Sequence, residues 1–157
     1  MRFGMAEGIL RPILVSLMSL VMLLIGDVVT VVAEPFTGIV KSVEGTAMIV
    51  RNGERTAAVK GMQLQKGDMV KTDPQGAIGM VFSDDTLISM GPNTEVCIDD
   101  YLFEPIEKRL SFVARILRGT VCFLSGQIAK LSPESVRLVM PVATIGVRGT
   151  HVLIKVD

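Results

Sequence analysis

The sequence predicts an all-β domain of short stacked strands, preceded by an N-terminal apolar segment. After residue 36, short runs of β-branched and aliphatic residues alternate with turn residues. Aromatic residues make up only 4% of the chain and Trp is absent, so we expect a core of Val, Ile, Leu and Met. Because no linker, charge run or low-complexity tract interrupts residues 36–156, we expect a single domain there.

The first 33 residues have the organisation of an export signal. Two arginines and one acid lie in the first eleven residues, and the next fifteen carry no charge. Small residues at positions 31–33 favour cleavage before Glu34. A retained inner-membrane anchor is the competing interpretation, because the apolar stretch approaches the roughly 20 residues that span a bilayer. In both cases we expect an exported protein, periplasmic or extracellular, with membrane contact limited to residues 12–33 of an uncleaved segment.

The charge balance argues against a nucleic-acid partner. The chain has 16 basic and 16 acidic residues, and the N-terminal segment contains two of each, which leaves 14 against 14. Phosphate binding requires a basic excess, so we expect no nucleic acid among the partners.

The strongest local prediction is a β-hairpin over residues 46–59. Asn52-Gly53 readily adopts the two positive φ angles of a type I′ turn, which places Arg51 opposite Glu54. An ion pair between these two side chains would add only a few tenths of a kcal/mol.

Further along, residues 77–82 predict an interior strand, because both of its faces are apolar. Residues 94–103 predict another strand, with Val96 and Ile98 on its inner face. The segment 104–117 fits helical spacing and strict alternation equally well, and its strand-rich neighbours favour a hairpin. Residues 128–136 predict a short helical turn, with Pro133 at the first helical position.

Two similar motifs occur thirty residues apart. Arg118-Gly119-Thr120 and Arg148-Gly149-Thr150 each precede an apolar strand, which suggests equivalent positions in stacked rungs. We interpret Arg118 and Arg148 as structural donors to turn carbonyls or to a carboxylate such as Asp99. Contact with an anion or a partner is the alternative.

Several segments carry a resemblance to a known family. They are GIV with VEG (38–45), GD with VKT (67–72), FSDDTLISMGPNTEV (82–96), RILRGTVCFLSGQIAK (115–130) and PVATIGVRGT (141–150). In this order they resemble a FecR-type domain over residues 36–156, the exported module named after a bacterial regulator of iron uptake. The resemblance implies a solenoid-like or roll-like β fold outside the cytoplasm and a role in protein interaction.

The chain departs from the family pattern in two turns and at its N-terminus. Asp84-Asp85-Thr86 replaces the usual Asp-Gly-Ser/Thr, and Met140-Pro141 replaces Thr-Pro. The family's namesake relays a signal from an outer-membrane receptor to a cytoplasmic sigma factor. Only about eleven residues precede the apolar segment, so we expect no sigma-binding domain.

No constellation of residues predicts catalysis or a cofactor. The lone His151 lies in a predicted strand, and no Gly-x-Ser-x-Gly elbow is present. We interpret the aspartates at 84, 85, 99 and 100 as turn acceptors rather than calcium ligands. Cys97 and Cys122 form a disulfide if their strands are adjacent, and are two buried thiols otherwise. We therefore expect no metal and no cofactor.

The sequence thus favours a non-enzymatic, exported interaction or envelope-assembly module. Its partner would be another envelope protein or a cell-wall polymer. A periplasmic signalling component is the second interpretation, and an enzyme acting on envelope polymers is the third.

Overall fold

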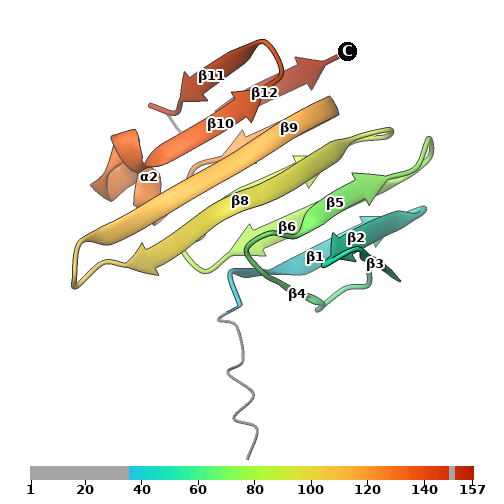
Figure 1. Ribbon diagram of the computed structural model, residues 1–157, viewed down its shortest axis with the longest axis horizontal. Coiled ribbons are helices and arrows are strands. Elements are labelled where there is room, and N and C mark those ends of the chain that lie inside the picture. Colours follow the sequence, from blue (N-terminus) through green and yellow to red (C-terminus); the bar gives the residue numbers. More distant parts are fainter. Residues whose placement is uncertain (1–35, 149–150) are drawn as a thin grey trace, which may run out of the picture. The chain divides into compact units, whose positions relative to one another are not determined.

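The computed structural model describes residues 36–148 and 151–157, and this part of the chain is mostly β-sheet (Figure 1). The predicted export segment lies outside the described residues, as do Gly149 and Thr150. Among the described helices, none has the length and apolarity that a membrane crossing requires. The elements are β1 (Gly38–Glu44), β2 (Ala47–Arg51), β3 (Glu54–Ala57), β4 (Gln63–Leu64), β5 (Met69–Thr72), β6 (Ala77–Phe82), β7 (Leu87–Met90), β8 (Glu95–Glu104), β9 (Arg109–Leu124), α2 (Gln127–Leu131), η1 (Pro133–Ser135), β10 (Val136–Met140), β11 (Ala143–Gly146) and β12 (His151–Val156).

The 16-residue strand β9 joins two halves of one curled sheet. Its C-terminal part pairs with β7 and β12, and with β6, β1 and β4 these strands form what we call half A. Its N-terminal part pairs with β8 and β10, and with β5, β2, β3 and β11 these strands form half B. Within residues 36–148 and 151–157, the strand pairs are antiparallel except for β9 with β10. The strands form a curled, half-barrel sheet, whose mostly antiparallel pairing differs from the parallel stacking expected of solenoid rungs.

The first hairpin has the expected turn but a different ion pair. Asn52 and Gly53 have φ angles of 51° and 84°, and Arg51 lies opposite Glu54 in the register. The Arg51 guanidinium turns instead to Asp68, with Nε 2.7 Å from Oδ1 and Nη2 2.8 Å from Oδ2. Asp68 is fully buried, so it offers a stronger bidentate partner than the exposed Glu54.

The other strand predictions are confirmed. Strand β6 lies between β1 and β7, and Val96 and Ile98 on β8 are buried. The ambiguous segment 104–117 is a hairpin between β8 and β9. The predicted helical turn begins earlier than expected, at Gln127, and continues as η1 with Pro133 at its start.

The core lies between the two halves and contains more aromatic contacts than the composition predicts. Most buried side chains are Val, Ile, Leu, Met and Ala, as expected. However, the Phe82 ring on β6 lies 5.0 Å from the Phe112 ring on β9 and 5.5 Å from the Tyr101 ring on β8. Phe112 also contacts Phe123 at 5.5 Å. Overall aromatic content was a poor guide because four of the seven aromatic residues converge on one point of the core.

Candidate interaction surface

The first Arg-Gly-Thr motif lies where β9 passes from half B to half A. Gly119 adopts a φ of +93°, which L side chains rarely take. A Cβ atom at this position would lie 2.5 Å from the Cα of Thr94 and closer still to its hydroxyl. The glycine is therefore required both by the backbone angle and by the close approach of the start of β8.

Threonine hydroxyls form hydrogen bonds with backbone groups at the point where β9 passes from half B to half A. The backbone N–H of Thr120 donates to Oγ1 of Thr94 at 3.0 Å, and the N–H of Gly91 donates to the carbonyl of Thr120 at 2.9 Å. The hydroxyl of Thr72 donates to the carbonyl of Gly91 at 2.6 Å and accepts from the N–H of Thr94 at 2.9 Å. These bonds satisfy backbone groups that a strand changing partners would otherwise leave unpaired.

Arg118 pairs with a carboxylate, as one form of the structural interpretation expected, and the carboxylate is that of Glu95. Its Nη2 lies 2.7 Å from Glu95, because the register places these two residues opposite each other. Glu95 also lies 3.4 Å from Lys71. Asp99, the carboxylate that we gave as an example, binds Arg115 at 2.7 Å.

Arg148, the described residue of the second motif, does not stack on Arg118. Strand β12 runs antiparallel to β9, with His151 opposite Leu124 and Val156 opposite Gly119. Arg148 therefore precedes the end of β12 that lies farthest from Arg118, so the two arginines do not occupy equivalent rungs. Arg148 is exposed and lines a shallow hollow with Pro133, Glu134, Gly146 and Val147.

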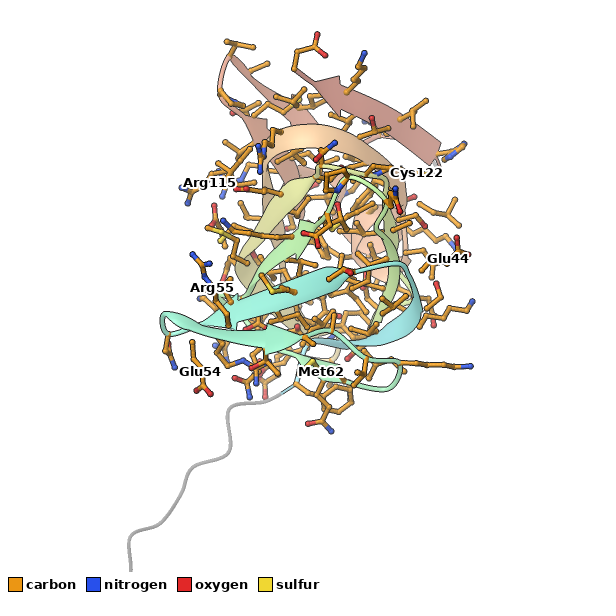
Figure 2. All side chains as sticks on the ribbon, turned by 90° about the vertical axis from the view of Figure 1, so that its right-hand side faces the viewer. Glu44, Glu54, Arg55, Met62, Arg115 and Cys122 are labelled. Atoms are coloured by element: carbon orange, nitrogen blue, oxygen red, sulfur yellow. The ribbon has the colours of Figure 1, made fainter. Side chains whose placement is uncertain are left out.

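The charged side chains of half B gather on its outer face. Residues at alternate strand positions point away from the core, and Figure 2 shows Arg55 and Arg115 on the same side of the sheet. This outer face carries five cations against two carboxylates. Farther along the β8–β9 hairpin, Asp100 pairs with Lys66 and Glu104 pairs with Arg109. These pairs are neutral, so they do not change the excess of three positive charges on the outer face. We call the following set the arginine face: Arg55 on β3, Lys71 on β5, Glu95 and Asp99 on β8, Arg115 and Arg118 on β9, and Arg137 on β10.

The two cysteines are free thiols on opposite outer faces, so the possible disulfide is absent. Cys97 points outward from half B between the buried Val96 and Ile98, whereas Cys122 points outward from half A. Neither thiol is fully buried. Partial burial raises the pKa of Cys97 to about 11, with a further contribution from Asp99.

The buried carboxylate of Asp84 organises the turn after β6. It accepts hydrogen bonds from the Thr86 hydroxyl at 2.7 Å, the Tyr101 hydroxyl at 3.2 Å and the N–H of Ile128 at 3.2 Å. Burial and the nearby Asp84 raise the pKa of Tyr101. Its neighbour Asp85 takes the positive φ of 67° at the position where the family pattern has Gly. Asp84 and Asp85 thus act as turn residues.

The sequence interpretation missed two features of the outer faces. One is the arginine face, which is visible in the sequence only when outward positions of separate strands are added together. The other is a contact of 2.9 Å between Sγ of Cys122 and Nε2 of His151. Both depend on which strands are neighbours, and alternation within one strand does not contain that information.

Comparison with known proteins identifies one family. A family model described as FecR protein matches residues 68–157. No curated protein and no solved structure matches the chain. The matched range covers more than half of the chain and includes the buried Asp68, the Asp84 turn and the glycine crossing of β9. With these features inside the match, the chain belongs to the FecR protein family.

Proposed function

We propose that this chain is an exported, non-catalytic interaction module that binds an acidic envelope protein through the arginine face. The surplus of three positive charges on one outer face of the sheet carries this proposal. Membership of the FecR family is consistent with an envelope location and with a component of periplasmic signalling.

The arginine face has the properties that recognition of carboxylates requires. Guanidinium groups bind carboxylates with two parallel hydrogen bonds, and four of the five cations are arginines. Among the described residues, Arg55 and Arg137 take part in no salt bridge, and Glu95 is shared by Lys71 and Arg118. Acidic side chains of a partner would complete these pairs.

The sheet holds these cations at fixed spacing. Arg55 and Arg137 are separated by five strand-to-strand steps, which corresponds to roughly 24 Å at about 4.8 Å per step. This span matches one side of a protein interface of ordinary size. The aliphatic Val50, Met69 and Val139 lie among the cations and would add apolar contact.

Three alternatives have less support. Family membership favours a periplasmic signalling component, which would use the same face toward a separate regulatory protein. An anionic cell-wall polymer would also match the charge of this face, although a repeating polymer does not require cations distributed over a width of six strands. For an enzyme acting on envelope polymers, we find no catalytic arrangement of side chains among the described residues.

The test is capture of a partner from envelope extract, followed by titration with the purified partner. The double variant R55E/R137E removes the cations that have no salt bridge. A matched variant, K41E/K60E, makes the same charge change away from the face, at exposed positions. We expect R55E/R137E to weaken binding by about 100-fold, or about 1.4 kcal/mol for each substitution, and K41E/K60E to leave it unchanged.

If the parent chain, R55E/R137E and K41E/K60E bind the partner with equal affinity, the arginine face is excluded as the binding surface. Capture of an anionic polymer in place of a protein, with the same sensitivity to R55E/R137E, would support the polymer alternative. Mass spectrometry of the exported protein would address processing, and an N-terminus at Glu34 is expected if the signal is cleaved.

A further inference from the structure

Cys122 and His151 form a thiol–imidazole pair on the outer face of half A. Strands β9 and β12 are antiparallel neighbours, with Cys122 opposite Leu153 and His151 opposite Leu124. The two side chains therefore occupy diagonal positions on the same face, where long side chains reach each other. Sγ lies 2.9 Å from Nε2, so one group donates a hydrogen bond to the other. Figure 2 shows Cys122 on the side of the sheet opposite to Arg115.

We propose that this pair is a thiol-exchange site, at which Cys122 forms a mixed disulfide with a small disulfide such as glutathione disulfide. A nucleophile within hydrogen-bond reach of a base is the arrangement that activates a thiol. An exported protein also meets disulfides in an oxidising compartment. The site is on the opposite face from the arginine face and does not depend on the proposed function.

The exchange conserves the number of S–S bonds and the number of protons. His151 accepts the proton of the Cys122 thiol, and the thiolate attacks one sulfur of the incoming disulfide. A new S–S bond forms to Cys122 while the S–S bond of the small disulfide breaks. The leaving thiolate takes the proton from the imidazolium and departs as a thiol. The reaction is stoichiometric, and a second thiol reverses it.

The surroundings of Cys122 leave the sulfur open to attack. On β7 the directly opposite residue is Ser89, a small and exposed side chain, and the next outward residue is Leu87. On β12, Leu153 lies opposite and is 71% exposed. Lys155 is the other titratable group facing outward on this strand, and it pairs with Asp157 at 3.4 Å. His151 is the neighbour that forms a hydrogen bond with the thiol.

Cys97 provides a control within the same molecule. It is also a partly exposed thiol on an outer strand face, but its neighbour is the carboxylate Asp99. Burial and this carboxylate raise the pKa of Cys97 to about 11, which lowers the thiolate fraction at neutral pH. The two cysteines therefore differ in the chemical group beside the sulfur, an imidazole in one case and a carboxylate in the other.

The experiment measures glutathionylation of the full chain by mass spectrometry at several pH values. In the C97A background we expect Cys122 to react about tenfold faster at pH 7 than Cys97 does in the C122A background. Adding H151Q to C97A should slow Cys122 by about tenfold and change the shape of the pH–rate profile, because the base beside the thiol is lost. Free imidazole should restore part of the rate in H151A.

Two further variants serve as controls for the reaction rate of Cys122. S89A changes the neighbour opposite Cys122 without removing the imidazole, so it should leave the rate unchanged. R55E/R137E should also leave it unchanged, which distinguishes this site from the arginine face. If H151Q reacts at the same rate and with the same pH profile as the parent while circular dichroism shows a folded sheet, the proposal is wrong.

Discussion

Gly119 lies so close to the backbone of Thr94, where β9 passes from half B to half A, that no Cβ atom fits between them. This relationship explains why an Arg-Gly-Thr motif stands inside a 16-residue strand. The glycine lets β9 change direction, and the N–H of the following Thr120 donates to the hydroxyl of Thr94 at 3.0 Å. One strand can then belong to both halves of the sheet.

Substituting Gly119 should therefore destabilise the domain strongly. Gly119→Ala adds the strain of a positive φ, about 1–2 kcal/mol, to a clash with the backbone of Thr94. Gly53→Ala is the matched control, since Gly53 has a φ of +84° but nothing within 4 Å of an added Cβ. In urea denaturation we expect Gly119→Ala to lose at least about 2 kcal/mol more than Gly53→Ala. Equal losses would show that the close approach to Thr94 is relieved without cost.

The pair of the half-buried Arg51 and the fully buried Asp68 supports a second stability prediction. Arg51→Met removes both guanidinium donors from the fully buried Asp68 and keeps the N–H of Gln65, which donates at 2.8 Å. Because removing one partner of a buried ion pair leaves an uncompensated charge, we expect a loss of about 3 kcal/mol. Glu54→Gln is the control, since Glu54 lies opposite Arg51 but is exposed, and its loss should stay below about 0.5 kcal/mol.

The two adjacent aspartates in the turn after β6 should respond differently to the same substitution. Asp84→Asn places an NH₂ group among the donors of Thr86, Tyr101 and Ile128, so we expect a loss of about 2 kcal/mol in unfolding free energy. Asp85→Asn keeps a residue that tolerates positive φ and should change stability by less than about 0.5 kcal/mol. Thermal denaturation of both variants measures the difference. A smaller effect at Asp84 than at Asp85 would contradict the assigned role of the buried carboxylate.

The raised pKa of Cys97 predicts a loss of stability in alkali. Its thiol stays protonated up to a pKa of about 11 in the folded chain, whereas the unfolded chain releases this proton at an ordinary thiol pKa of about 8.5. The unfolded state therefore binds fewer protons between these values, and stability falls as pH rises through this window. Below the window both states hold the proton and the contribution is constant. Urea denaturation from pH 7 to pH 10 should show a shallower decline in C97A than in the parent chain, and parallel curves would contradict the assignment.

The sequence predicted several local features because each depends on residues that are close together in the chain. The type I′ turn at Asn52-Gly53 follows from two residues that accept positive φ. The buried positions Val96 and Ile98 follow from the period-2 alternation of a strand. The hairpin at 104–117 was favoured by its neighbours, and the FecR resemblance rested on motifs read in order.

What the sequence by itself determined is therefore the class of fold, the main turns and the family. Only the tertiary structure decided which strands are neighbours, and with them the partners of Arg51 and Arg118, the separation of Cys97 from Cys122 and the meeting of Cys122 with His151. The physical reason is that turn geometry and alternation act over a few residues, whereas these partners are brought together by the packing of two halves around a common core.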